Sequence, residues 1–433
     1  MKMLLCLCAL RRAWGRLLVL ALLLAGARPG YGQGPGPFQL VRARQRCMSL
    51  PLQVQRNLPI VQVWLNGAGP YNFLLDTGVA SSLLLSPAVA DSLHMPHGQD
   101  FRVMGAGGKP TGLQAYQAPR VRVGLGRRGQ EAVAPAMALL VLNGDSLNLS
   151  GYVGLPVHGI LGSELFQSFV AAFEGQAGGQ ERLVLTPPAA YRPPRSRRWA
   201  GLPLAIEGRK AYFTVPVRQV GDSAARPLKL LLDTGASHAL SLETTSDPRL
   251  HLPAPGLPAD LGHGLTGLVR GVLGRVATVE LGRYRLPTVL TSFPNGADVH
   301  ARTDVFRNGS VGYELLRRFR VVIDYPHRQL WLRRGLAFGE PFEHDMAGFD
   351  VLATGPTLHR YQVLGVVPGT PAAAAGLQDG DELLAVGILP VELLSLTQLT
   401  HLLRSTSGTV LHLIVRRPGG ALHTASVRLE RRI

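Results

Sequence analysis

Two aspartates are the first candidates for chemistry, because each ends a run of leucines and is followed by the same two residues. Asp76 lies in LLDTGVASS and Asp233 lies in LLLDTGASH. A carboxylate at the end of an apolar strand is unfavourable unless it is hydrogen-bonded or used in a reaction. The threonine supplies a hydroxyl that can bond a neighbouring backbone, and the glycine allows a sharp turn. Average composition places one such triplet in roughly one chain in ten of this length, so two triplets in matching contexts indicate a functional site.

The sequence around one triplet matches the sequence around the other. Residues 50–67 and 202–221 both alternate apolar and polar residues, as half-buried strands do. Downstream, GILGSELFQSF at 159–169 faces GSVGYELLRRF at 309–319, with Gly, Gly, Glu, Leu and Phe at the same offsets. This agreement predicts an internal duplication, with repeat 1 at residues 40–185 and repeat 2 at residues 200–334. The proline- and arginine-rich residues 186–199 predict a semi-extended linker between the repeats.

Each repeat also contains a glycine-rich stretch downstream of its triplet. GAGGKPTG begins at Gly105 and GHGLTGLVRG begins at Gly262, and alternating residues that end in a turn follow both. This pattern favours a mobile hairpin, although an ordinary surface loop is the alternative on glycine content alone. The candidate hairpin glycines are Gly105, Gly107, Gly108, Gly262, Gly264 and Gly267.

The first 27 residues have the pattern of a secretory signal peptide, with cationic residues, an apolar stretch and small residues before a cut after Ala27. The alternative is an uncleaved N-terminal membrane anchor, although the apolar stretch is shorter than the ~20 residues of a usual span. The mature chain is expected to be exported, in the periplasm or secreted, without a transmembrane span. Only Cys47 lies beyond the leader, so the mature chain cannot form an internal disulfide.

The chain is basic, with a formal net charge of +17 that falls to +13 when the four cationic residues of the leader are removed. This charge favours contact with anionic lipid, cell-wall polymer or acidic protein. Nucleic acid is not an expected partner, because the arginines are scattered and no aromatic-rich recognition motif accompanies them. The sequence contains no HExxH, CxxC or GxSxG pattern, so no metal, no cofactor and no serine nucleophile is expected.

With these motifs, residues 42–333 resemble the retropepsin-like aspartic proteases, whose two half-sites each bring one Asp-Thr-Gly triplet. The resemblance implies a mainly β fold, in which duplicated acid-protease β-barrel repeats form a pseudo-dimer. It also implies that Ile160-Leu161-Gly162 and Ser310-Val311-Gly312 pack beside the catalytic loops. Two positions depart from the family pattern: Ser310 replaces an apolar residue, and Val79 stands where the family prefers the alanine or serine type found at Ala236.

The implied chemistry is peptide hydrolysis by Asp76 and Asp233. Two carboxylates within a few ångströms cannot both ionise, so the pair holds one proton, a known property of aspartic proteases. One carboxylate takes a proton from the attacking water while the other protonates the peptide carbonyl, without a metal or a covalent intermediate. Flaps would close over an extended peptide substrate. The supporting loop residues would be Thr77, Gly78, Thr234 and Gly235, with the two threonines locking the loops together.

Because one chain holds both half-sites, the favoured arrangement is a monomer with an intramolecular pseudo-dimer and one cleft, since a covalent linker raises the effective concentration of the halves. The alternative is that each repeat pairs with the same repeat of a second molecule, which gives two symmetric sites. A different class of function is also open: a duplicated fold that has lost activity and serves as a catalytically silent peptide-binding scaffold.

The C-terminal residues 342–433 do not repeat the duplicated pattern. Residues 371–377 predict a short helix entered by a proline, and Ser395 with Gln398 forms a capping-box pattern before a second helix. The stretch PGTPAAAAGLQDGDELLAV is similar to PDZ domains found beside bacterial periplasmic proteases. This resemblance implies strands with two helices, and a loop of Ala347, Gly348 and Phe349 that holds the terminal carboxylate of a peptide. The alternative is a brace that packs on the protease and binds no peptide. The sequence thus predicts an exported aspartic endopeptidase with a PDZ domain that recruits a substrate or partner.

Overall fold

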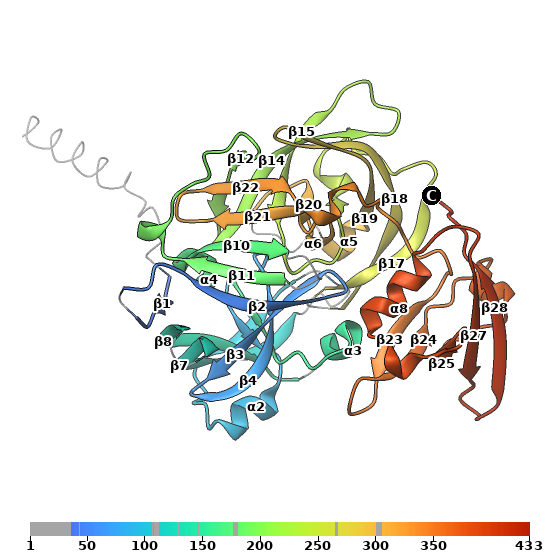
Figure 1. Cartoon of the computed structure of the whole chain (residues 1–433), viewed down its shortest axis with the longest axis horizontal. Coiled ribbons are helices and arrows are strands. Elements are labelled where there is room, and N and C mark those ends of the chain that lie inside the picture. Colours follow the sequence, from blue (N-terminus) through green and yellow to red (C-terminus); the bar gives the residue numbers. More distant parts are fainter. Residues whose placement is uncertain are drawn as a thin grey trace, which may run out of the picture. The chain divides into compact units, whose positions relative to one another are not determined.

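The computed structural model describes residues 36–433, apart from residues 43, 106, 108–111, 128–129, 145–146, 176–180, 265–266 and 300–304. The expected signal peptide at residues 1–27 and the hairpin candidate Gly108 therefore lie outside the described residues. Strands predominate in the described part (Figure 1), and no helix in it is long and apolar enough to cross a membrane.

The first half of the chain is a strongly twisted set of strands in which apolar residues alternate into the core. In β3, for example, Val61, Val63 and Leu65 are buried while Gln62 is exposed. The strands are β1 Gln39–Leu40, β2 Met48–Gln55, β3 Leu58–Leu65, β4 Ala68–Leu75, β5 Leu83–Leu84, β6 Asp100–Val103, β7 Leu113–Arg127, β8 Gln130–Leu142 and β9 Gly159–Leu161. The short helices are α2 Pro87–Ser92, α3 Leu149–Val153 and α4 Ser163–Ser168.

The second half has the same strand pairing as the first. β4 pairs in parallel with β9, as β15 does with β20, and β5 and β16 each lie antiparallel to that partner. The long antiparallel pair β7–β8 has its counterpart in β18–β19. The elements of this half are β13 Ala205–Glu207, β14 Lys210–Gln219, β15 Arg226–Leu232, β16 Leu240–Leu242, η2 Thr244–Ser246, β17 Leu257–Gly264, β18 Gly267–Leu281, β19 Tyr284–Pro294, α5 Gly296–Val299, β20 Gly309–Val311 and α6 Tyr313–Leu316.

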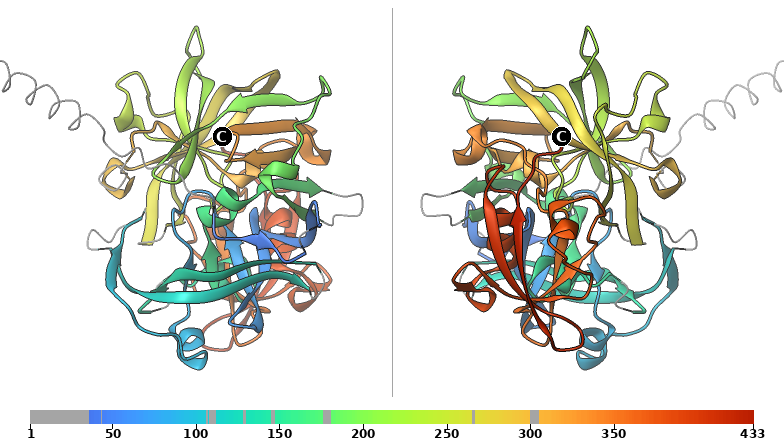
Figure 2. Two further views of the ribbon diagram at one scale, coloured as in Figure 1. Left: turned by 90° about the vertical axis from the view of Figure 1, so that its left-hand side faces the viewer. Right: turned by 90° about the vertical axis from the view of Figure 1, so that its right-hand side faces the viewer.

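A set of strands from both halves joins them into one body. Figure 2 shows β10 and β11 in green and β21 and β22 in orange between the blue-to-teal strands of the first half and the yellow strands of the second. β10 pairs antiparallel with β21, and Ala171 faces Ile323. One hydrophobic cluster runs through both halves and includes Leu75 and Leu232, which directly precede the two aspartates. These joining elements are β10 Val170–Gly175, β11 Glu181–Thr186, η1 Pro188–Ala190, β12 Ala200–Pro203, β21 Phe319–Asp324, β22 Gln329–Arg334 and η4 Leu336–Gly339.

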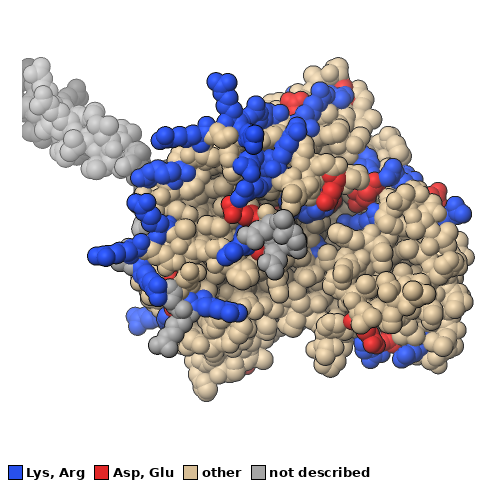
Figure 3. All heavy atoms as spheres, viewed as in Figure 1, with Lys and Arg blue, Asp and Glu red and all other residues tan. Residues whose placement is uncertain are grey.

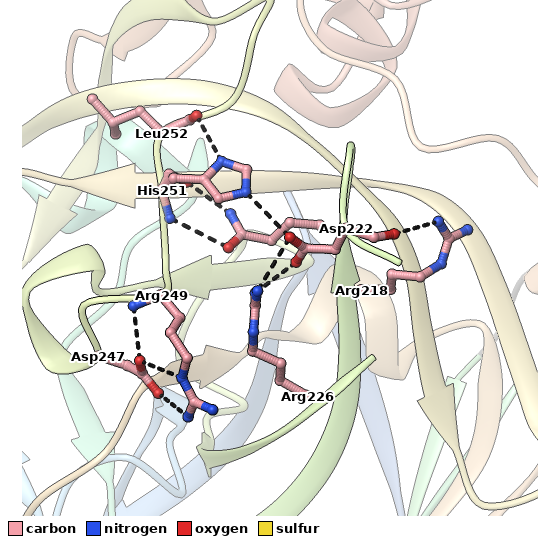
Figure 4. A network of polar contacts seen from close by, with 8 residues as sticks. Arg218, Asp222, Arg226, Asp247, Arg249, His251 and Leu252 are labelled. Carbon is pink, nitrogen blue, oxygen red and sulfur yellow. Dashed lines mark hydrogen bonds and ion pairs between the residues drawn. The ribbon is translucent and has the colours of Figure 1, made fainter. Parts of the chain in front are cut away.

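A polar network holds the segment that leads into β17 (Figure 4). Asp222 accepts two hydrogen bonds from Arg226, at 2.5 and 3.2 Å, and lies 3.7 Å from His251 Nε2. The Gln219 side chain donates to His251 O at 2.7 Å and accepts from His251 N at 3.3 Å. The network therefore anchors the start of the β17–β18 hairpin to the end of β14.

The C-terminal region forms its own sheet and its own core, which includes Phe349, Val351 and Leu399. Its elements are β23 Asp350–Thr354, β24 Arg360–Leu364, α7 Pro371–Ala374, β25 Glu382–Val386, β26 Leu389–Pro390, η5 Val391–Leu393, α8 Leu396–Leu403, β27 Val410–Arg416 and β28 Leu422–Arg428. The predicted capping box is confirmed, because Gln398 N donates to Ser395 Oγ at 3.2 Å and Ser395 N donates to Gln398 Oε1 at 2.8 Å.

Basic side chains are unevenly spread over the face drawn in Figure 3. They gather on the part of that face where β10, β21 and β22 lie, and they are sparse over the C-terminal sheet. Arg333 and Arg334 of β22 lie over the rings of Trp199 and Phe338, with 5.6 and 4.5 Å between the guanidinium carbon and the ring centre. On this face, the basic residues are therefore concentrated over the strands that join the two halves.

Candidate active site

The two aspartates occupy equivalent positions directly after paired strands. Asp76 follows β4 and its main-chain N–H donates to Leu161 O of β9 at 3.0 Å. Asp233 follows β15 and its N–H donates to Val311 O of β20 at 3.0 Å. The parallel strand beside each loop therefore holds the start of the triplet, and the Ile-Leu-Gly and Ser-Val-Gly segments lie where the resemblance placed them.

The two threonines join the loops by reciprocal hydrogen bonds. Thr77 Oγ1 donates to Leu232 O at 2.6 Å and accepts from Thr234 N at 3.0 Å. Thr234 Oγ1 donates to Leu75 O at 2.9 Å and accepts from Thr77 N at 3.1 Å. Both threonines have no exposed surface. Each half therefore supplies its hydroxyl to the strand end and the loop of the other half.

The triplet glycines let the two carboxyl groups approach each other. A Cβ atom added to Gly235 would lie 2.2 Å from Asp76 Cγ, and one added to Gly78 would lie 2.9 Å from Asp233 Cγ. Either position is too close for a side chain, so each carboxyl group occupies the space that any residue other than glycine in the opposite loop would fill. Each glycine N–H also donates to the aspartate of its own triplet, at 2.7 Å for Gly78 and 3.1 Å for Gly235.

The two carboxyl groups differ in the charges that surround them. Burial and then the negative charge of Asp233 raise the pKa of Asp76 to about 8. Burial also raises the pKa of Asp233, but the positive charge of Arg307 opposes this rise, whereas Lys210 lowers the pKa of both aspartates. The two side chains are hydrogen-bonded to each other. The geometry thus favours a proton on Asp76 and a negative charge on Asp233.

Several residues around the two aspartate loops were not identified from the sequence. Arg307 forms an ion pair with Glu243 at 2.8 Å. Its counterpart in the first half is the uncharged Val157, so only the second half has a positive charge at this position. Arg209 reaches from the β13–β14 turn to Ser81 Oγ at 3.3 Å in the first half. Of these residues, only Glu164 has a signal in the sequence, because a glutamate recurs at the same offset in both repeats. Its Oε2 accepts from Ser82 Oγ at 2.9 Å.

The departure at Ser310 has a partner in the structure. Ser310 Oγ lies 3.0 Å from His238 Nε2, and the corresponding pair in the first half is Ile160 and Ser81. Burial, together with the charge of Arg307, lowers the pKa of His238 to about 4. The imidazole is therefore neutral near pH 7, and the serine satisfies one of its ring nitrogens.

We predict that Ser310→Ala lowers the free energy of unfolding by about 1–3 kcal/mol, because it leaves a nitrogen of the half-buried His238 without its partner. Chemical denaturation measures the change. When His238 is already replaced by alanine, Ser310→Ala should lower the free energy of unfolding much less than it does in the wild type, since the two side chains are coupled. Equal losses in both backgrounds would show that the contact contributes nothing.

One main-chain hydrogen bond of the loop with Val79 has its counterpart in the other half. Val79 O accepts from Ser163 N at 3.0 Å, as Ala236 O accepts from Tyr313 N at 2.7 Å in the other half. The valine side chain packs against a hydrophobic cluster of the first half that includes Leu74.

The glycine-rich stretches lie at the ends of hairpins. Gly262 and Gly264 are in β17 and Gly267 begins β18, while Gly105 and Gly107 lie between β6 and β7. Among the described residues, no group of three or more His, Cys, Asp or Glu side chains could hold a metal ion.

The loop expected to bind a peptide carboxylate precedes β23 and is buried at Ala347, Gly348 and Phe349. The N–H groups of Ala347 and Gly348 donate to the two carboxylate oxygens of Asp345, at 3.1 and 2.7 Å. These donors therefore already have an acceptor within the chain.

Comparison with known proteins agrees with these observations. Residues 61–165 match the family model described as an aspartyl protease, and residues 362–417 match the PDZ domain model. No curated protein matches the chain. The solved structures that resemble it include the aspartic proteinase from Irpex lacteus and Basic 7S globulin from soybean. The first is 12% identical with a TM-score of 0.41, over 68% of this chain and 99% of that one. The second is 10% identical with a TM-score of 0.37, over 68% and 97%. From the family models and the strand pairing, the chain contains an aspartyl protease domain with a mainly β, aspartic-protease-like fold, followed by a PDZ domain.

Proposed function

We propose that this protein is an exported aspartic endopeptidase that hydrolyses peptide bonds with a water molecule activated between Asp76 and Asp233. One observation carries the proposal: each carboxyl group lies against the glycine of the opposite loop, and the two aspartate side chains are hydrogen-bonded to each other. The reciprocal threonine bonds support it, because they fix both loops within one chain.

The asymmetry of the dyad assigns the two roles in this proposal. Asp233, which the charge of Arg307 favours as an anion, takes a proton from the water as its oxygen attacks the peptide carbonyl carbon. Asp76 gives its proton to the carbonyl oxygen, and a tetrahedral intermediate forms. Asp233 then returns its proton to the leaving amine as the carbon–nitrogen bond breaks, while Asp76 regains its proton from the intermediate. The β6–β7 and β17–β18 hairpins would close on the extended substrate.

The test is cleavage of a denatured protein mixture by the purified chain without residues 1–27, with and without a statine-type inhibitor. We expect activity while the pair holds one proton, and a loss of activity as the pH rises through about 8, where Asp76 ionises. At low pH activity should fall again when Asp233 is also protonated. Activity that the inhibitor leaves unchanged would point to another peptidase in the preparation. The absence of cleavage at any pH would favour the silent peptide-binding scaffold instead.

Export belongs to the same proposal and has its own test. The basis is the leader-like pattern of residues 1–27. Expression in a Gram-negative host followed by fractionation should yield the shortened chain in the periplasm. Full-length chain in the membrane fraction would instead indicate the uncleaved anchor.

A further inference from the structure

The groove in which a PDZ domain takes up a peptide lies between its edge strand and a helix, here β23 and α8. β23 is the end strand of the C-terminal sheet and pairs with β24 on one side, while none of the described strands pairs with its outer edge. A peptide that binds by strand addition must bond the main-chain groups on that outer edge.

Val351 presents its main-chain groups to the outer edge, and both have partners. Val363 is the residue of β24 that lies opposite Val351. Its main-chain N–H donates to Asp381 O at 2.8 Å and its C=O accepts from Gly380 N at 2.9 Å, so neither group bonds Val351. Val351 N donates to Asp350 Oδ1 at 2.8 Å, and Val351 O accepts from Arg56 Nη1 at 3.3 Å. Groups that a ligand strand would need are thus bonded within the chain.

Arg56 belongs to the protease, in the turn between β2 and β3, and it contacts both walls of the groove. Its side chain is 8% exposed, and its Nη2 donates to Asp350 Oδ1 at 2.7 Å. Its main-chain N–H donates to Thr397 Oγ1 of α8 at 3.0 Å. The Thr397 hydroxyl in turn donates to Gln55 Oε1 at 2.5 Å. The β2–β3 turn is therefore bonded to β23 and to α8.

Helix α3 of the protease packs on the same two walls. A Cβ atom added to Gly151 would lie 2.9 Å from Ala353 O of β23. One added to Gly154 would lie 2.8 Å from Leu396 Cβ of α8. The middle of α3 at Gly151 and the residue that follows the helix, Gly154, thus approach the two walls so closely that a side chain at either position would require a shift. Together with the bonds from Asp345 to the Ala347–Gly348 loop, these contacts close the groove from within the chain.

Tyr152 of α3 connects this closed groove to the β17–β18 hairpin. The Arg56 guanidinium lies 4.3 Å above the centre of the Tyr152 ring, and Arg56 Nη1 also donates to Tyr152 O at 3.2 Å. The same ring meets the imidazole of His263 in β17 edge to face, with 5.7 Å between ring centres. One aromatic side chain therefore lies between the PDZ groove and a candidate flap.

We propose that Arg56, Tyr152 and Asp350 form a latch that keeps the PDZ groove occupied by the protease itself and holds the β17–β18 hairpin in place. An extended peptide that adds to β23 must displace Arg56 from Val351 and move α3, which withdraws Tyr152 from His263 and frees the hairpin. The partner is thus a peptide in extended conformation that competes with the latch for the edge of β23. The role of the hairpin in cleavage rests on the proposed function, but the closed groove and its coupling to the hairpin do not.

The first test measures hydrogen exchange in the full mature chain. Asp350→Asn and Arg56→Met each break the ion pair, and we expect amides of both β23 and β17 to exchange at least about fivefold faster. Arg360→Met is the matched control, since Arg360 is bonded to Glu382 at 2.6 Å in the same domain but on β24 and β25. Faster exchange in β23 alone would overturn the coupling to the hairpin.

The second test measures binding of a fluorescent pool of ten-residue peptides with free C-termini. Both latch variants should bind the pool about 5–150-fold more tightly than the wild type, because the groove no longer has to be opened first. Equal binding by wild type and variants would overturn the closed groove. Tyr152→Leu should speed exchange in β17 through loss of the His263 contact, and unchanged exchange there would remove Tyr152 from the proposal. None of these measurements depends on cleavage, so they remain decisive even if the chain hydrolyses nothing.

Discussion

Asp76→Asn and Asp233→Asn should each abolish cleavage, with a loss in kcat/KM of at least about 10²–10⁴-fold, the range for losing a general acid or base. An amide at position 233 cannot take the proton of the water, and an amide at position 76 has no carboxylic proton to give. The dyad acts as a unit, so the double variant should be no worse than either single one. The assay is cleavage of the denatured protein mixture at the pH optimum of the wild type.

Stability supplies the control for this prediction. The pKa of Asp76 is about 8 in the folded chain, against 3.8 for an ordinary aspartate. Between these values the folded chain binds more protons than the unfolded chain, so its free energy of unfolding falls as the pH rises from about 4 to about 8. Asp76→Asn removes the titrating carboxyl group, and with it this decrease in the free energy of unfolding at higher pH. The inactive variant should therefore unfold at a higher temperature than the wild type near pH 7, which excludes misfolding as the reason for inactivity.

The same variants distinguish one shared site from two symmetric ones. If each repeat paired with the same repeat of a second molecule, each single variant would keep one intact site and about half of the activity. Complete loss in both variants is expected for a site made of Asp76 and Asp233 together.

Glu280→Gln is the control for removing a carboxylate away from the site. Glu280 is half-exposed, 4.0 Å from Arg285, and its replacement should leave cleavage unchanged.

Thr77→Val should give the second large effect, on stability. The valine keeps the shape of the side chain but loses the hydroxyl that bonds Leu232 O and Thr234 N. Two buried polar groups are then left without partners, at about 1–3 kcal/mol each, so the free energy of unfolding should fall by about 2–6 kcal/mol. Activity should fall as well, because the same bonds hold the two loops together. Urea denaturation at a fixed pH measures the stability change.

Thr77→Ser is the matched variant, since it keeps the hydroxyl and loses only a methyl group. It should cost about 1 kcal/mol, as a deleted buried methyl does. If serine and valine were equally destabilising, packing and not hydrogen bonding would account for the role of Thr77. Thr234→Val should behave like Thr77→Val, because its bonds to Leu75 O and Thr77 N are the reciprocal pair.

The pattern of the sequence was sufficient for the local parts of the site. Both triplets follow strands, the segments 160–162 and 310–312 lie beside them, and Ser395 caps α8 as predicted. These features depend on residues close together in sequence or on a pattern that occurs twice. The same holds for the aspartyl protease and PDZ assignments, which the family models confirm.

Arg307, His238 and the latch could not be inferred in that way. Arg307 interrupts the symmetry of the repeats, and a comparison of the repeats gives no reason to place its charge near Asp233. Arg56 and Asp350 are separated by 294 residues, and neither residue type nor spacing indicates that they meet. His238 and Ser310 each look like an isolated departure until the fold brings them together.

The sequence by itself determined that two Asp-Thr-Gly loops end two strands of a duplicated-looking β chain, because alternation, turn glycines and the leucine runs act over short distances. Only the tertiary structure decided which charges surround each carboxyl group, and that groups of the protease contact the edge of the PDZ groove. Both depend on charges and hydrogen-bond partners contributed by distant segments, and the pKa of a carboxyl group or the occupancy of a strand edge responds to whatever lies within a few ångströms in space.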